Sequence, residues 1–200
     1  MSSGHSSLER VCVYCASSEL CDDEFKRQAY RLGELLASRG VRIVYGGGAR
    51  GLMGQLASGA LARGGHVTGV MPRFMQELEW AHAGLSELQI VEDMRERKHR
   101  MLTGSDAAIA LPGGCGTLEE LLEAITLKRL GIYLKPIVMV NTRGFFDPLV
   151  ELLEHAVRER FMDERHRQMW RVAECAGDVI GAIESSAPWS VEARHYATLT

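Results

Sequence analysis

The chain has 200 residues, of which 46% are hydrophobic and 24% are charged, and its formal net charge is -3. This composition is typical of a folded globular protein and excludes a disordered or fibrous chain. The acidic balance argues against a general nucleic-acid binder. The longest apolar runs fall far short of the roughly 20 residues that span a bilayer, and no charged-then-apolar leader begins the chain. We therefore expect a cytoplasmic protein.

Strands and helices are expected to alternate along the chain. Apolar runs predict strands at 10–14, 41–45, 66–71, 87–91, 107–111, 136–141 and 172–174. Helical spacing predicts helices at 22–38, 52–63, 93–103, 117–130, 148–160, 164–170 and 177–186, with an irregular stretch or short helix at 74–84. This order predicts one α/β domain with a doubly wound, Rossmann-like parallel sheet. The domain is expected to span 10–186, between a disordered tail at 1–9 and a loose tail at 187–200.

The five cysteines do not form an obvious pattern of disulfides or metal ligands. Cys12 and Cys15 have redox-pair spacing, but Cys12 lies in a predicted buried strand, where alternate residues point to opposite faces. No second pair of Cys or His residues has ligand spacing, and an odd cysteine count argues against a disulfide framework. We therefore expect no metal site.

Two glycine-rich segments each follow a predicted strand and open a predicted helix. The first begins Gly46-Gly47-Gly48, and the second, 112–117, reads Pro-Gly-Gly-Cys-Gly-Thr. Ligands of doubly wound sheets bind at the carboxyl ends of the strands. Glycine backbone amides and a helix N-terminus together attract anions. Either segment is therefore a candidate phosphate site, and a plain tight turn is the alternative for the first.

Charged residues fall at the same edge of the predicted sheet. The charge-rich segment 94–101 on its own is typical of a solvated helix face, but it follows the fourth strand and so lies beside both glycine loops. This position favours a ligand role for Arg97 and Lys98. Glu119 and Glu120 lie near the start of the helix after the second loop, where the helix dipole alone would favour acidic residues. We expect the loop amides and Thr117 to hold a phosphate while one glutamate faces sugar hydroxyls or a water.

These segments closely resemble the Lonely Guy (LOG) family, also labelled "lysine decarboxylase-like", over residues 10–183. Residues 112–120 match the family's P-G-G-x-G-T-x-x-E, with Cys115 where relatives commonly carry Tyr or Phe. Residues 94–101 match M-x-x-R-K-x-x-M, and 46–54 resemble G-G-G-x-x-G-L-M-G. Residues 79–85 are similar to the bacterial E-x-A-H-x-G-L.

The resemblance implies a phosphoribohydrolase without metal or cofactor. Such enzymes cleave the N-glycosidic bond of N6-substituted (cytokinin) adenosine 5′-monophosphates, in some relatives also AMP, and release the base and ribose 5-phosphate. Arg97 and Glu120 match the catalytic pair. The residues expected to bind the substrate are Ser17, Gly46, Gly47, Gly48, Glu79, Lys98, Gly113, Gly114, Cys115, Gly116, Thr117, Leu118, Glu119 and Thr126. A homodimer with the second subunit near the active site is also implied, and the helices at 94–101 and 118–130 are candidates for its interface.

The chemistry agrees with this set of residues. Glycosidic cleavage passes through an oxocarbenium-like transition state with positive charge on the sugar. A carboxylate such as Glu120 would either stabilise this charge or orient the attacking water. Arg97 is a poor proton donor because its pKa exceeds about 12, so we expect it to act electrostatically. Glu119 and Glu120 point about 100° apart on a helix, and the sequence leaves open which of them faces the ribose.

Two other functions remain as alternatives, and lysine decarboxylation is chemically implausible. A nucleotide sensor or carrier of the same fold would not need the pair Arg97 and Glu120. A nicotinamide-dependent oxidoreductase would need an acidic residue at the end of the third strand, and residues 66–71 contain none. Lysine decarboxylation normally needs pyridoxal phosphate on a lysine, and of the four lysines, Lys98 already belongs to the family motif.

Overall fold

The computed structural model describes residues 8–77 and 81–197. Within them, parallel strands form one sheet in the order β4-β3-β2-β1-β5-β6-β7. The strands are β1 (Arg10–Tyr14), β2 (Arg42–Tyr45), β3 (Val67–Pro72), β4 (Glu87–Val91), β5 (Ala107–Ala110), β6 (Ile137–Val140) and β7 (Arg171–Ala173). The helices are α1 (Asp23–Ala37), α2 (Gly51–Leu61), α3 (Met94–Leu102), α4 (Cys115–Arg129), α5 (Asp147–Arg158) and α6 (Val179–Glu184).

The order of the strands reverses beside β1. The chain builds outward from β1 to β4, then returns to place β5 on the other side of β1, where Val11 pairs with both Ile43 and Ala107. The crevice at such a reversal is the usual ligand site of open α/β sheets. The predicted single, doubly wound α/β fold is confirmed.

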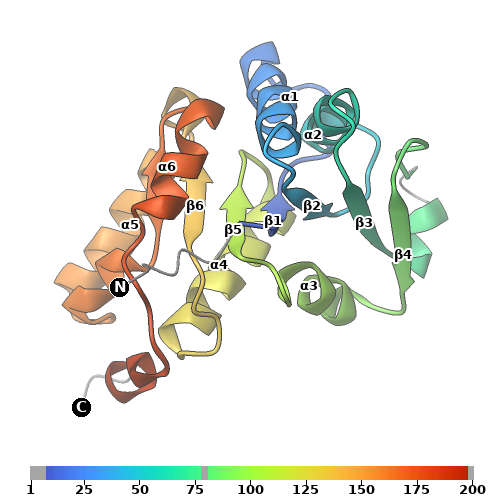
Figure 1. Ribbon diagram of the computed structural model, residues 1–200. Helices are drawn as coiled ribbons and strands as arrows, with labels where there is room; N and C mark the ends of the chain where they lie inside the picture. The colour runs from blue at the N-terminus through green and yellow to red at the C-terminus, as the bar shows by residue number, and fades with distance from the viewer. Residues whose placement is uncertain (1–7, 78–80, 198–200) are drawn as a thin grey trace, which may run out of the picture.

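Two helical layers cover the sheet (Figure 1). α1, α2 and α6 pack with Val11 and Val13 of β1 on one face, and α3, α4 and α5 pack with Cys12 and Tyr14 on the other. Cys15 lies in the first cluster and is therefore separated from Cys12 by the sheet. Among the described helices, none has the length and apolar character needed to cross a bilayer.

The helices differ in how their N-termini are capped. The Asp22 side chain accepts from the Glu24 amide of α1 at 2.9 Å, and Asp93 accepts from the Glu96 amide of α3 at 2.8 Å. The N-cap residues of α2 and α4, Arg50 and Gly114, make no side-chain cap hydrogen bond. The first amides of α2 and α4 must therefore find other partners.

The expectation of a loose C-terminal tail is wrong for the described residues. Trp189 Nε1 donates to the Lys128 carbonyl at 2.7 Å, and Ala193 is fully buried in a 3-10 helix, Val191–Tyr196. The rings of Trp189 and Tyr196 lie 6.2 Å apart, edge to face. Aromatic side chains of this size bury enough surface to hold a short segment against a domain.

Smaller differences concern the ends of elements. Leu8 and Glu9, assigned to the N-terminal tail, are ordered, and the Glu9 amide donates to Asp106 Oδ2 at 3.0 Å. The helix expected at 164–170 is a 3-10 helix, Glu164–Gln168, and the segment after β3 is another, Arg73–Glu77. α4 starts at Cys115, so two residues expected in the turn are already helical.

Candidate active site

A cavity of about 360 Å³ opens at the reversal point of the sheet. The loop after β1, the start of α4, and the residues following β3 and β4 form its walls. It is lined by Cys15, Ala16, Ser17, Ser18, Met53, Met75, Met94, Arg97, Gly114, Gly116, Thr117 and Glu120. Topology alone predicts a ligand site here, and both expected catalytic residues lie in it.

The start of α4 is open toward this cavity. A Cβ atom added at Gly114 or Gly116 would meet no atom within 4 Å. Neither residue has a positive φ, so the backbone conformation does not require glycine there. These glycines therefore leave space beside the uncapped amides of α4, where an anion would approach the backbone closely. The Thr117 side chain lies against Gly113 and adds a hydroxyl to the wall of the cavity.

The start of α2 is closed, although its glycine loop has a similar sequence. The Met53 amide donates to the Ala16 carbonyl at 3.1 Å. A Cβ atom at Gly51, which has φ +56°, would lie 2.4 Å from the Ser18 carbonyl oxygen. The loop after β1 thus covers the N-terminus of α2, which leaves no room for a phosphate.

The glycines 46–48 pack inside the protein. None of them lines the cavity. A Cβ at Gly47 would lie 3.5 Å from the Cα of Gly69, and Gly48 forms an antiparallel bridge with Ala81. Gly46 contacts the Arg97 guanidinium, which lies between this glycine and the cavity.

Arg97 is a buried cation held by the backbone of the sheet. Its Nε donates to the Val70 carbonyl of β3 at 3.2 Å, and its Nη2 donates to the Gly46 carbonyl after β2 at 3.4 Å. Its Nη1 lies 3.8 Å from the sulfur of Met94 and 4.0 Å from that of Met75. The side chain is about 5% exposed. The guanidinium is therefore fixed at the edge of the cavity before any ligand arrives.

Glu120 forms an ion pair with Arg97 in the wall of the cavity. Its Oε1 lies 3.7 Å from Arg97 Nη1, and the residue is 7% exposed. Burial raises the pKa of the Glu120 carboxyl to about 7, although the charge of Arg97 opposes this shift. A carboxyl that changes charge near neutral pH inside a cleft is a typical feature of catalytic sites.

Glu119 has a different environment from that of Glu120. Lys98 binds Glu119 Oε1 at 2.5 Å and Glu123 Oε2 at 3.0 Å on the outer side of α4. The hydrogen bond to Glu119 raises the pKa of the Lys98 ammonium. Glu120, not Glu119, is therefore the carboxylate available to a ligand in this cavity.

The expected site residues fall into three groups. Those in the cavity are Ser17, Arg97, Gly114, Gly116, Thr117 and Glu120. Those on the outer surface of α4 are Cys115, Leu118, Glu119 and Thr126, with Lys98 reaching across from α3. Those behind the cavity wall are Gly46, Gly47, Gly48 and Gly113. Glu79 lies outside the described residues.

Sequence reasoning missed the apolar part of the cavity wall. Met53, Met75 and Met94 line it together with Cys15, Ala16 and Ser18. Met53 and Met94 lie inside the matched motifs, which was the available signal. Met75 lies in a 3-10 helix with no motif, and only its position after β3 places it at this edge.

Three features of the described residues concern the alternative chemistries. No lysine is among the described residues that line it. In the part of the chain that the structure describes, no three His, Cys, Asp or Glu residues are grouped as metal ligands. β3 contains no acidic residue that could bind the ribose of a dinucleotide.

The fold and the cavity define the class: a Rossmann-like α/β protein with a cavity of about 360 Å³ at the reversal of its sheet. The family model described as "Possible lysine decarboxylase" matches residues 53–183. The cytokinin riboside 5′-monophosphate phosphoribohydrolases LOG1 of Arabidopsis thaliana and LOG of Oryza sativa subsp. japonica are each 40% identical to this chain. Each match covers 92% of this chain, with 86% of the Arabidopsis and 76% of the rice protein. The chain belongs to this LOG family of phosphoribohydrolases.

A solved structure extends the likeness of the fold. The molybdenum cofactor carrier protein of Chlamydomonas reinhardtii superposes with a TM-score of 0.68 at 19% identity, covering 88% of this chain and 96% of that chain. At this identity the likeness concerns the fold alone.

Proposed function

We propose that this protein hydrolyses the N-glycosidic bond of N6-substituted adenosine 5′-monophosphates, and of AMP, to release the free base and ribose 5-phosphate. The observation that carries the proposal is one cavity that joins an open helix N-terminus to a buried Arg97–Glu120 pair. Membership of the LOG family supports the same reaction.

The two ends of the cavity have separate roles in this proposal. The 5′-phosphate binds the amides of Gly114 and Gly116 and the hydroxyl of Thr117, since the helix N-terminus favours an anion. The ribose then lies toward Glu120. The C1′–N9 bond breaks, its electron pair leaves with the adenine, and positive charge develops on the sugar.

Glu120 and Arg97 act on opposite partial charges of this transition state. The Glu120 carboxylate stabilises the oxocarbenium-like sugar and orients the water whose oxygen bonds to C1′. One proton of this water passes to the carboxylate and from there to the departing base, and the other stays on the new 1′-hydroxyl. Arg97 stays protonated and stabilises the negative charge on the leaving group. Because its guanidinium is already fixed by two carbonyls, little reorganisation is needed during the reaction.

A product assay tests the proposal. The purified protein is incubated with AMP or N6-isopentenyl-AMP, and free base and ribose 5-phosphate are separated by chromatography. We expect both products from the wild type, a loss of at least about 100-fold in Glu120→Gln, and normal turnover in the matched surface variant Glu151→Gln. Binding of nucleotide without release of base would support the sensor or carrier function instead.

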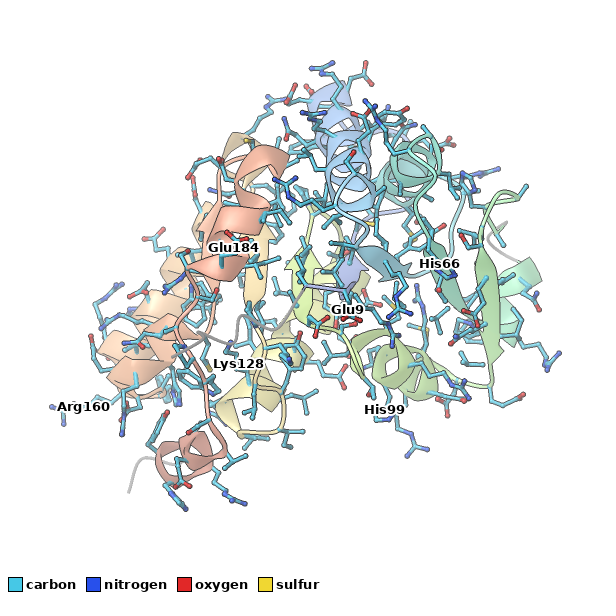
Figure 2. All side chains as sticks on the ribbon, viewed as in Figure 1. Glu9, His66, His99, Lys128, Arg160 and Glu184 are labelled. Atoms are coloured by element: carbon cyan, nitrogen blue, oxygen red, sulfur yellow. The ribbon has the colours of Figure 1, made fainter. Side chains whose placement is uncertain are left out.

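We also propose that the protein is a homodimer joined through the outer surface of α4. Leu118 and Leu122 form an apolar strip there, and Ile132 beyond it is 67% exposed. A second cavity, of about 690 Å³, lies between α3 and α4. His99, which Figure 2 labels, is one of its lining residues. Exposed apolar surface of this kind is typical of interaction sites. A second copy on this surface would place Cys115, Leu118, Glu119 and Thr126, the expected substrate residues on the outer side of α4, next to a cavity of the partner copy.

Sedimentation at micromolar concentration tests the dimer. We expect a dimeric wild type, a monomeric Leu122→Glu variant, and an unchanged Leu152→Glu control, since Leu152 lies exposed on α5. A monomeric wild type would overturn the proposal, and a dimeric Leu122→Glu variant would move the interface elsewhere.

A further inference from the structure

The first glycine loop has an unexpected neighbour, the guanidinium of Arg97. A Cβ atom at Gly46 would lie 2.2 Å from Arg97 Nη2 and 3.3 Å from Arg97 Cζ. The space that a side chain at position 46 would fill is therefore occupied by the guanidinium. The same residue's carbonyl accepts a hydrogen bond from Nη2.

We propose that Gly46 is a positioning residue for catalysis, which acts through Arg97 and does not bind the substrate's phosphate. Its missing side chain leaves space for the guanidinium, and its carbonyl accepts a hydrogen bond that holds the guanidinium beside Glu120. This inference deepens the proposed function and rests on it. Gly46 does not line the cavity, and the closed start of α2 leaves the loop no free anion site.

Geometry separates Gly46 from most other packed glycines of the protein. At Gly51, Gly54 and Gly59 an added Cβ would collide with backbone atoms at 2.1 to 2.4 Å. At Gly46 the three nearest atoms belong to the ends of two side chains, Arg97 and Met53. Gly46 has no positive φ, so alanine suits its backbone. A methyl group here would therefore displace the guanidinium and leave the backbone in place.

Displacement of Arg97 has a specific consequence for Glu120. The charge of Arg97 lowers the Glu120 pKa against the opposing effect of burial. When the guanidinium moves away, the Glu120 pKa rises further. An electrostatic change of this kind distinguishes a positioning role from general loosening of the fold.

The test compares Gly46→Ala with Gly181→Ala, a matched control whose added Cβ meets no atom within 4 Å. We expect Gly46→Ala to lower kcat for AMP by about 10- to 100-fold, since small displacements in active sites cost this much, with KM changed less than about threefold. The acidic limb of the pH–rate profile should move to higher pH. Gly181→Ala should keep wild-type kinetics. A raised KM with normal kcat would overturn the proposal, because it would place Gly46 at the phosphate.

A double-mutant cycle makes the test independent of how well the variant folds. In an Arg97→Ala background the clash is gone, so adding Gly46→Ala should lower kcat by less than about twofold. Equal losses in both backgrounds would mean that Gly46 acts on the fold and not through Arg97.

The proposed function can fail separately. If the wild type releases no base from any nucleotide, the Glu120 pKa is measured by carbon NMR of the carboxyl. A higher value in Gly46→Ala than in the wild type would still support the positioning of Arg97, and an equal value would overturn it.

Discussion

The clearest energetic test of the site is the replacement Glu120→Gln. Burial raises the Glu120 pKa from 4.5 to about 7, net of the attraction to Arg97. Because the pKa is raised in the folded protein, the carboxyl is tolerated below pH 4.5 and costs stability as the pH rises to about 7. At about 1.4 kcal/mol per pKa unit, the full cost above pH 7 is about 3 kcal/mol. Glutamine has nearly the same shape and no charge.

We therefore expect Glu120→Gln to be more stable than the wild type by less than about 1 kcal/mol at pH 5 and by about 3 kcal/mol at pH 9. The assay is urea unfolding followed by circular dichroism at each pH, at one fixed protein concentration. The exposed control Glu151→Gln should stay within about 0.5 kcal/mol of the wild type.

A stability difference that does not grow between pH 5 and 9 would refute the reasoning, because it would mean that Glu120 is not a strained buried carboxylate. The opposite result, a less stable glutamine variant at pH 9, would mean that the attraction to Arg97 exceeds the cost of burial. The expected pairing of higher stability with lost turnover is the signature of a residue kept for function.

Three further predictions concern other parts of the protein. If Glu120 acts as a carboxylate, kcat/KM for AMP should rise with pH through about 7, and a flat pH–rate profile from pH 5 to 9 would contradict this role. Gly116→Ala should weaken AMP binding by about 10-fold, as measured by calorimetry, with no fall in Tm, since the added methyl meets only open cavity. Lys128, labelled in Figure 2, is buried with its Nζ 2.6 Å from the Lys135 carbonyl, and burial lowers its pKa to about 8. The unfolding free energy of Lys128→Met relative to the wild type should therefore fall by about 2 kcal/mol between pH 7 and 9.5, as the wild-type lysine loses its proton, and a constant difference would show that Lys128 does not titrate there.

Most of the sheet could be predicted because most of its strands are short runs of apolar residues. β5 and β6 are apolar along their whole length and buried on both faces, as central parallel strands are. A glycine follows the end of α1, as is common for helices, and this residue, Gly40, has φ 71°. The edge that carries the site followed from the same topology.

The C-terminal segment could not be predicted because its stability comes from distant partners. The sequence around Pro188 matches no motif. What holds it is the hydrogen bond from Trp189 to the last turn of α4 and the packing of Tyr196 on His166, with ring centroids 5.5 Å apart. Such contacts join residues far apart in the sequence, and local patterns do not record them.

The division of work between Glu119 and Glu120 also needed the structure. Both residues have the same side chain on the same turn of α4. Their chemistry differs because one meets Lys98 at the surface and the other meets Arg97 in the cavity. The helix rotation of about 100° per residue guarantees that they diverge, but only the packing of α4 on the sheet decides which one turns inward.

The two glycine loops show the same limit at the level of the backbone. Each follows a strand and opens a helix without a side-chain cap. The segment after β1 contacts both loops and determines which of the two helix N-termini is open. The Ala16 carbonyl accepts from the Met53 amide of α2, while the Ala16 amide donates to the Pro112 carbonyl just before α4. One peptide segment therefore blocks the amides of α2 and binds the second loop through a carbonyl, so the amides at the start of α4 stay free for an anion. Sequence motifs record side chains, but main-chain groups determine which of the two candidate phosphate sites is open.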